Sequence, residues 1–392
     1  MKVLLVADIH QRMISGVYVS MMNLAHGLKS MGHEVKLLIV SDRVNNVKTP
    51  DSYQIASFNA SMFYPNIRLI FPFSDIVHIH DIIRWHPDVI HTQSEFFTMS
   101  RAFYIARRLG IPVIHTYHTL WGDPEYIKYF NKYFGGFISE STVGMLLRNR
   151  LLTERIAALI APTEKTREIL LSYGIDKPIY IIPSGIYLSK FSSLPDEEFL
   201  KRKREEFGFK PDDKVMLFVG RVSKEKHIAE LMEYYFKAKN DIPNLKFLIV
   251  GGGPESEHMR EMADASPYSK DVILTGLVST TEVHKYYSLG DVFATASTSE
   301  TQGITYIEAM ASGTPVLCRE DKSVEELMKN GVNGLTFEDY ETFRKGLLDL
   351  IYDQNKREEI INNAKQTASV FSVEHFTESV VGVYRDAIEA FS

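Results

Sequence analysis

The sequence contains a single cysteine, Cys318, among its 392 residues. One cysteine excludes an intramolecular disulfide and any metal site built from several cysteines, and it fits a reducing compartment. No run of 18 or more apolar residues is present, so we expect no helix that spans a bilayer. The amino terminus, MKVLLVADIH, carries Asp8 and His10 where a signal peptide would still be apolar. We therefore interpret it as a first strand and not as a targeting segment.

The net charge of −6 is unevenly distributed along the chain. Residues 1–195 carry 20 Lys and Arg against 15 Asp and Glu, a balance of +5, whereas residues 196–392 carry 24 against 35, a balance of −11. A basic half is typical of a domain that meets nucleic acid or an anionic membrane surface. Ordinary scatter of charge between two domains explains the same numbers, and charge alone does not choose between these interpretations.

Short apolar runs rich in β-branched residues alternate with helical patterns along the whole chain. Such runs are typical of strands that are buried on both faces of a parallel sheet. We expect strands at Val3–Val6, Val35–Val40, Asp88–Thr92, Pro112–Thr116, Ala157–Ala161, Ile179–Ile182, Val215–Val219, Phe247–Val250, Val272–Leu274, Val292–Ala294 and Pro315–Leu317. Two of the intervening helices are expected at Val19–Lys29 and Ser94–Leu109. The alternation predicts an α/β fold with right-handed crossovers.

The pattern restarts after a polar, charged segment at residues 192–210. We expect a first Rossmann-like, doubly wound domain over residues 1–190 and a second over residues 195–371. The last helix, within residues 372–392, is amphipathic and follows the second sheet, so it could pack on either domain. Open parallel sheets bind ligands outside the carboxyl ends of their strands. Functional residues are therefore expected in the loops that directly follow strands.

Two such loops follow predicted strands of the second domain. In the first, Arg221 and Lys226 are five residues apart and can hold a diphosphate from two sides, one as a planar fork and the other as a point charge. A solvated basic loop is the alternative interpretation. The second loop reads Gly251-Gly252-Gly253 and permits close approach of the backbone to a ligand, although an ordinary strand-to-helix turn has the same composition.

A third strand end carries two carboxylates eight positions apart, Glu300 and Glu308. We expect a helix to begin near Gly303, which places Glu300 beside the exposed N–H groups of the first turn. Glu308 then lies more than one turn into the helix, about 7 Å along its axis from the start. Acceptors at this separation suit a sugar and a ribose of one ligand. The alternative is a pair of glutamates on a helix surface, against which the small residues around them argue.

The first domain offers fewer candidate residues. Gly16 follows the first strand, where it could let backbone N–H groups approach a phosphate or could serve as a turn glycine. His118 follows the strand that ends at Thr116 and could donate a hydrogen bond to a sugar hydroxyl or assist proton movement. The other histidines, His78, His80 and His91, have no convincing Cys, Asp or Glu grouping around them, so we expect no metal cofactor.

Two stretches of the basic half, residues 62–73 and 121–152, interleave aromatic and aliphatic residues with cations. This composition is typical of a surface that inserts side chains into a lipid headgroup layer. The cations assigned to that surface are Arg68, Lys128, Lys132, Arg148 and Arg150. A core helix beside an ordinary basic face is the alternative.

In combination, these motifs resemble the retaining glycosyltransferases of family 4, which have the GT-B fold. The resemblance covers nearly the whole chain. It implies two Rossmann-like domains facing a cleft, a nucleotide-sugar donor held mainly by the second domain, and a terminal helix that returns to the first.

The resemblance also implies a role for each motif. Arg221 and Lys226 match the diphosphate pair, Glu300 the residue that binds the donor sugar, and Glu308 the residue that binds the ribose. The other matched positions are Gly16 facing the donor phosphate, His118 near the donor sugar, Gly253 in the glycine-rich turn, Leu277 and Val278 beside the base, and the backbone of Gln302, Gly303, Ile304 and Thr305 around phosphate and sugar. His118, Glu300, Arg221 and Lys226 are the residues assigned to catalysis.

Three positions depart from the family pattern. Ser15 and His227 stand where glycines are usual, and Tyr187 stands where an acidic residue is usual. The departures bear on the geometry of the loops near the donor.

Within the family, residues 92–96, 115–119 and 299–306 are most similar to bacterial diacylglycerol glucosyltransferases. That similarity implies the transfer of a hexose with retention of configuration, from UDP-glucose as the donor to a lipid such as diacylglycerol as the acceptor. It places the reaction at the cytoplasmic face of the membrane. The implied partner is an anionic membrane surface, and no nucleic acid is expected to bind. Residues 120–124 depart from that group, which bears on the acceptor. The alternatives are the same chemistry on a soluble organic acid or saccharide, and a nucleotide-sugar-binding protein without turnover.

Overall fold

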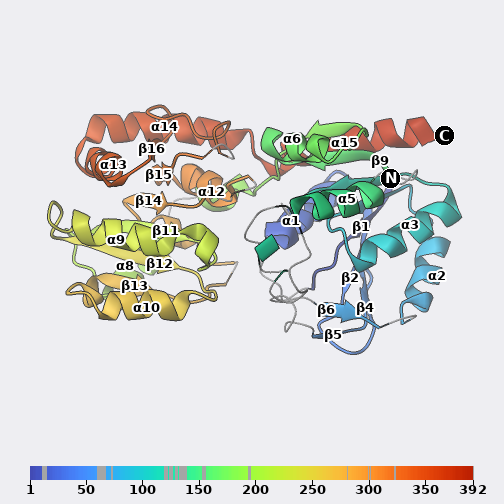
Figure 1. Ribbon diagram of the computed structural model, residues 1–392, viewed down its shortest axis with the longest axis horizontal. Helices are drawn as coiled ribbons and strands as arrows, with labels where there is room; N and C mark the ends of the chain where they lie inside the picture. Colours follow the sequence, from blue (N-terminus) through green and yellow to red (C-terminus); the bar gives the residue numbers. More distant parts are fainter. Residues whose placement is uncertain are drawn as a thin grey trace. The chain divides into compact units, whose positions relative to one another are not determined.

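The structure is a computed structural model, shown in Figure 1. It describes residues 1–10, 16–59, 68–71, 74–118, 122, 127–128, 131, 139–151, 156–192, 196–279, 281–298, 300, 302–321 and 324–391.

The chain divides into two compact units, residues 1–185 with residues 373–392, and residues 186–372. The boundary precedes the 190–195 region in which the sequence placed it. The physical reason is that helix α7 (Leu188–Ser192) packs against α11 (Val283–Tyr287) and α12 (Ile304–Ser312), which are helices of the second unit.

The first unit is built on an eight-stranded sheet with the order β10-β9-β8-β7-β1-β2-β4-β3. Neighbouring strands pair parallel, except for β3 and β4. The strands are β1 (Lys2–Val6), β2 (Glu34–Val40), β3 (Val47–Lys48), β4 (Ser52–Ile55), β7 (Val89–Thr92), β8 (Val113–Thr116), β9 (Ile156–Ala161) and β10 (Ile179–Ile181). A separate antiparallel pair consists of β5 (Ser57–Asn59) and β6 (Arg68–Ile70).

Both faces of this sheet are buried, as the apolar runs predicted. Along β1, Leu4 and Val6 belong to one core cluster while Val3 and Leu5 belong to another, because successive side chains of a strand point to opposite faces. The helices are α1 (Gly16–Ser30), α2 (Ile76–Trp85), α3 (Phe97–Leu109), α5 (Glu140–Leu151), α6 (Glu164–Ser172) and α15 (Val373–Phe391).

Helix α3 begins three residues later than the sequence predicted. The hydroxyl of Ser94 donates to Oδ2 of Asp8 (2.8 Å) and accepts from the backbone N–H of Asp8 (2.7 Å). Ser94 is therefore held at the end of β1 and not in the helix.

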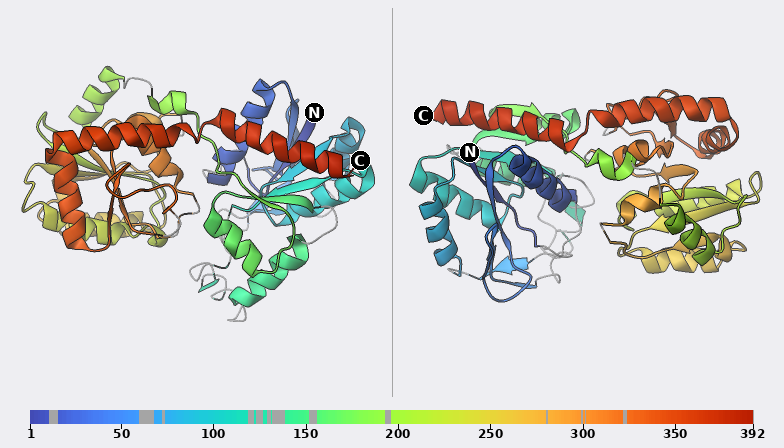
Figure 2. Two further views of the ribbon diagram at one scale, coloured as in Figure 1. Left: turned by 90° about the horizontal axis from the view of Figure 1, so that it is seen from above. Right: turned by 180° about the vertical axis from the view of Figure 1, so that it is seen from behind.

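The terminal helix α15 belongs to the first unit, where it packs against α1 and β9 (Figure 2). The packing of α1 on α15 is tight, because a Cβ atom at Gly27 would lie 2.0 Å from Oγ1 of Thr377. A buried hydrogen bond of 2.6 Å between Nδ1 of His91 and the hydroxyl of Tyr384 joins α15 to the sheet.

The second unit is built on a six-stranded parallel sheet with the order β13-β12-β11-β14-β15-β16. Its strands are β11 (Lys214–Val219), β12 (Leu245–Val250), β13 (Val272–Leu274), β14 (Val292–Thr295), β15 (Val316–Arg319) and β16 (Leu335–Phe337). Its remaining helices are α8 (Glu197–Glu206), the 3-10 helix η1 (Lys224–Lys226), α9 (Ile228–Ala238), α10 (Ser256–Asp264), the 3-10 helix η2 (Ser269–Asp271), α13 (Tyr340–Tyr352) and α14 (Gln354–Ser369). The two doubly wound sheets confirm the predicted α/β fold. Among the helices that the structure describes, none is both long enough and apolar enough to cross a bilayer.

Candidate functional site

The strand order of each sheet marks where a ligand is expected. In the second unit the order reverses between β11 and β14, and in the first unit it reverses between β1 and β7. Such a switch point leaves a crevice at the carboxyl ends of the strands, where open α/β sheets bind ligands. Arg221 and Lys226 follow β11 and Glu300 follows β14, so three predicted site residues lie at the switch point of the second unit.

Two of these side chains meet directly. The Nζ atom of Lys226 lies 2.6 Å from Oε1 of Glu300, and both side chains are largely buried, with exposed fractions of 20% and 15%. The side chain of Arg221 is exposed and makes no hydrogen bond or ion pair within the described part of the chain. The site therefore presents one cation that is open to an anion and a second that is shared with a carboxylate.

The glycine-rich turn after β12 packs closely against the loop that follows β11 and carries Arg221 and Lys226. A Cβ atom at Gly251 would lie 1.8 Å from the carbonyl oxygen of Gly220, and one at Gly253 would lie 2.2 Å from that of Val222. The backbone N–H of Gly253 donates to Oγ of Ser256 at 2.9 Å. Close packing of two loops thus accounts for these glycines. Beyond the next strand, Leu277 is 73% exposed, whereas Val278 packs against the core.

Helix α12 begins as predicted, with Gly303 as its N-cap in a left-handed conformation (φ 73°) that favours glycine. The backbone N–H groups of Gly303, Ile304 and Thr305 find no acceptor among the described residues. Free N–H groups at a helix start attract anions, and the helix dipole adds to that attraction. Gln302 is buried just before the helix.

Glu308 lies one turn into α12 and is held by a residue that the sequence did not single out. The hydroxyl of Tyr287 donates to Oε2 of Glu308 at 2.6 Å. Burial raises the pKa of Glu308 to about 7, and the hydrogen bond from Tyr287 acts in the opposite direction. No local signal in the sequence connects the two, because Tyr287 is 21 residues away on another helix.

In the first unit, Gly16 is the first residue of α1, and the preceding residues 11–15 lie outside the described residues. His118 follows β8, and its Nε2 lies 2.6 Å from Oε1 of Gln93. Burial, with a contribution from His115, lowers the pKa of His118 to about 3. The imidazole is therefore neutral near pH 7, which favours the predicted hydrogen-bonding role over proton transfer.

The predicted membrane cations lie in different surroundings. The guanidinium of Arg68 donates to Oγ of Ser57 (2.7 Å) and to its carbonyl oxygen (3.0 Å), which ties it to the β5–β6 pair. Lys128 and Arg148 are exposed, and Nε of Arg148 donates to the carbonyl oxygen of Gly174 at 3.3 Å. Lys132 and the side chain of Arg150 lie outside the described residues.

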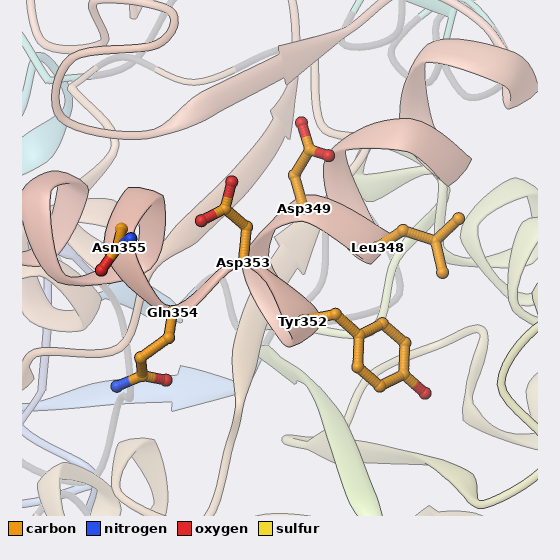
Figure 3. Close-up of a pocket in the computed structure, with 6 residues that line it drawn as sticks. All are labelled: Leu348, Asp349, Tyr352, Asp353, Gln354 and Asn355. Atoms are coloured by element: carbon orange, nitrogen blue, oxygen red, sulfur yellow. The ribbon is translucent and has the colours of Figure 1, made fainter.

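A hollow with a volume of about 590 Å³ lies elsewhere in the second unit, at the junction of α13 and α14 (Figure 3). Its lining residues are Leu348, Asp349, Tyr352, Asp353, Gln354 and Asn355. Both aspartates are engaged by Lys356, whose Nζ donates to Asp349 (2.7 Å) and whose backbone N–H donates to Asp353 (3.1 Å). No strand-end loop contributes to this hollow, so it is separate from the candidate site. The described residues contain no group of three or more His, Cys, Asp or Glu that could hold a metal ion.

Comparison with known proteins matches each half of the chain to a glycosyltransferase model. Residues 14–190 match the model described as Glycosyltransferase Family 4, and residues 200–367 match the model described as Glycosyl transferases group 1. The alpha-monoglucosyldiacylglycerol synthase of Streptococcus pneumoniae is 31% identical over 99% of this chain and 86% of its own length. The chain belongs to glycosyltransferase family 4.

A second relative and a solved structure support the assignment of this glycosyltransferase to the family. The alpha-monoglucosyldiacylglycerol synthase of Acholeplasma laidlawii is 28% identical over 99% of this chain and 98% of its own. Among solved structures, Anabaena HepE in complex with UDP-glucose has a TM-score of 0.76 at 15% identity, covering 98% of this chain and 100% of that one. The likeness to HepE confirms the GT-B fold.

One departure from the family pattern has a structural cost. His227, which stands where the family usually has glycine, has φ 50° and ψ 37°, so it is left-handed. Its Nε2 lies 3.4 Å from Oγ1 of Thr298, in the loop that also carries Glu300. A left-handed conformation costs an L-residue about 1–2 kcal/mol, whereas glycine adopts it freely.

Replacing His227 by glycine is therefore expected to raise the free energy of unfolding by about 1 kcal/mol, because the relief of strain exceeds the entropy that a glycine loses on folding. Guanidinium unfolding of the variant and the parent measures the change. His86→Gly, at the other described non-glycine residue with positive φ, is expected to show a similar gain. A His227→Gly variant less stable than the parent would show that the contact with Thr298 outweighs the strain.

Proposed function

We propose that this glycosyltransferase transfers glucose from UDP-glucose to diacylglycerol at the cytoplasmic face of the membrane, with retention of configuration. The full-length match to two alpha-monoglucosyldiacylglycerol synthases carries this proposal. The glucose of UDP-glucose is α-linked, so an α-glucoside product corresponds to retention.

The geometry of the second unit supports a role for each residue in this reaction. Arg221 and Lys226 stabilise the charge that develops on the leaving UDP, and the free N–H groups at the start of α12 add to the positive field. Glu300 binds hydroxyls of the glucose and Glu308 those of the ribose. Leu277 and Val278 contact the base. In the first unit, neutral His118 donates or accepts a hydrogen bond at the sugar.

The experiment that tests the proposal is turnover of a panel of UDP- and GDP-sugars with diacylglycerol in anionic mixed micelles. We expect α-glucosyl-diacylglycerol from UDP-glucose, with the anomer assigned by NMR. Soluble acceptors form the second arm, because the D-inositol 3-phosphate glycosyltransferase of Geodermatophilus obscurus is 26% identical over 78% of this chain. Turnover of a soluble acceptor without turnover of diacylglycerol would overturn the lipid assignment.

No divalent metal is proposed to take part, because Arg221, Lys226 and the N–H groups at the start of α12 can supply the positive charge that a diphosphate requires. Activity is therefore expected to survive EDTA and to remain unchanged when Mg²⁺ or Mn²⁺ is added. The measurement is the initial rate in metal-free buffer and after each addition. A loss of activity in EDTA that Mg²⁺ or Mn²⁺ restores would contradict this expectation.

Attachment to an anionic membrane is proposed for the first unit through its residues 1–185, which carry 19 Lys and Arg against 15 Asp and Glu, whereas the acidic α15 lowers the balance of the whole unit to +1. Helix α5 supports this proposal, because Met145 and Leu146 are 56% and 60% exposed. Met145 lies three residues before Arg148, so an exposed apolar side chain and a cation share one face of the helix. Inserted apolar side chains beside cations give reversible binding to a headgroup layer without a spanning helix.

Replacing Lys128, Lys132, Arg148 and Arg150 together by glutamine is expected to weaken binding to vesicles rich in anionic lipid. Each Lys or Arg near such a surface contributes about 1 kcal/mol, so the loss is expected to exceed 10-fold even if only two of the four act. Co-sedimentation at physiological salt measures it. Hydrolysis of the donor in detergent should be unchanged.

The matched control removes the same charge from exposed positions of the second unit, Lys201, Arg260, Lys270 and Lys345. This control variant should bind the vesicles as well as the parent. If the first-unit variant also binds like the parent, the membrane surface has been assigned to the wrong residues and a soluble acceptor becomes the better interpretation.

A further inference from the structure

Tyr287 is the last residue of α11, and both its ring and its backbone carbonyl group are held by neighbouring residues. Its side chain is fully buried, and its ring packs against Phe191 and Phe293 with centroid distances of 5.9 and 6.0 Å. Its carbonyl oxygen accepts hydrogen bonds from Oγ1 of Thr314 (2.9 Å) and from the N–H of Gly290 (3.0 Å). The hydroxyl therefore has a defined position before it meets any partner.

That hydroxyl donates to Oε2 of Glu308 at 2.6 Å. A free glutamate side chain has several rotatable bonds, and ordering it costs conformational entropy. The tyrosine removes much of that freedom in advance, because its own ring is already held by packing. The second carboxylate oxygen, Oε1, makes no hydrogen bond within the described residues and remains available to a ligand.

We propose that Tyr287 is a positioning residue for the nucleotide: its buried hydroxyl holds one oxygen of Glu308 and thereby presents the other oxygen to the ribose hydroxyls. The inference rests on the proposed function, in which Glu308 binds the ribose. Tyr287 itself touches no substrate atom in this arrangement. It acts through Glu308, and its effect is confined to ligands that carry ribose hydroxyls.

The charge state of Glu308 supports this role. Burial raises the pKa of the carboxyl to about 7, and Tyr287 is the residue whose hydrogen bond opposes that rise. The causes of the shift within the described residues include no charged group on the other elements packed against α12, among them Lys190 on α7, His284 and Lys285 on α11, Arg319 on β15 and Lys365 on α14. A carboxylate accepts hydrogen bonds from two ribose hydroxyls better than a protonated carboxyl does. Tyr287 therefore favours both the orientation and the ionisation that the ribose requires.

The test is calorimetric titration of the full chain with UDP and with 2′,3′-dideoxy-UDP at pH 7. For the Tyr287→Phe variant we expect the affinity for UDP to fall on the order of 10-fold and the affinity for the dideoxy nucleotide to change less than 2-fold. The matched control is Tyr286→Phe on the same helix, since the ring of Tyr286 packs on Phe199 and lies near Lys203. The control should bind both nucleotides like the parent.

A pH series supplies a readout that a merely structural role would not move. UDP affinity of the parent is expected to decrease as pH falls through about 7, and in Tyr287→Phe this decrease is expected to begin at higher pH. The pH dependence of UDP binding by the parent protein can be measured without any variant. This part of the test therefore remains even if Tyr287→Phe is unstable. Equal weakening of UDP and of the dideoxy nucleotide, or no weakening of either, would overturn the inference while leaving the proposed donor intact. A parent that binds neither UDP nor GDP would instead overturn the proposed function.

Discussion

Replacement of Arg221 or Lys226 by alanine is expected to lower kcat/KM for the nucleotide sugar by about 10- to 150-fold. Each cation follows β11 at the switch point, where it can face the diphosphate, and a hydrogen bond to a charged group contributes about 1.5–3 kcal/mol. The Lys226 variant is expected to be the more damaging, because it also leaves Glu300 without the partner that now lies 2.6 Å away. Steady-state kinetics with varied donor measures both effects.

The matched control for this prediction is Lys224→Ala. Lys224 lies in the same loop and is exposed, so the variant removes the same charge without removing either proposed contact. It should retain activity near that of the parent. Near-parental activity in both the Arg221 and the Lys226 variants would contradict the assignment of this loop to the diphosphate.

Replacement of Glu308 by glutamine is expected to impair donor binding while making the empty protein more stable at pH 8. The pKa of Glu308 is raised from an ordinary 4.5 to about 7 by burial, so the fold disfavours the charged form. Because the pKa is higher in the folded than in the unfolded state, the protonated carboxyl stabilises the fold. This contribution to the free energy of unfolding is fully present below pH 4.5 and is lost as pH rises through 7. Glutamine is neutral at every pH and can still accept the hydrogen bond from Tyr287, so it keeps that stability.

The gain at pH 8 is expected to be at most about 3.5 kcal/mol, from roughly 1.4 kcal/mol per pKa unit. Chemical unfolding at pH 5 and pH 8 measures it, and the difference between variant and parent should shrink towards pH 5. Glu359→Gln, at an exposed position of α14, removes the same charge and should change neither stability nor turnover. A Glu308→Gln variant that is no more stable than the parent at pH 8 would show that this carboxyl is not held against its ionisation.

The strands of both sheets could be predicted from the sequence because their signal is local. A strand buried on both faces is a continuous apolar run, and each run can be identified without knowledge of its neighbours. The strands that the sequence missed are β3, β4, β5, β6 and β16, which are two to four residues long. Segments this short carry too few apolar residues to form a recognisable run, and their pairing with a neighbouring strand is what identifies them.

The positions of the candidate residues also follow from local pattern, because parallel strands place their loops at one edge. Arg221, Lys226, Glu300 and Glu308 could be named from strand ends and spacing alone, and their roles stay predictions. Their partners could not be named. Lys226 meets Glu300 across 74 residues, Tyr287 meets Glu308 across 21, and His118 meets Gln93 across 25.

Protonation depends on the same long-range contacts. The sequence pattern around a glutamate is the same whether its pKa is near 4.5 or near 7. The same holds for a histidine, whether it is charged or neutral. The difference arises from the removal of water when separate elements pack around the group. The sequence by itself determined which residues stand at the ends of the strands, whereas only the tertiary structure decided which of them are paired, which are buried and therefore which carry a charge at neutral pH.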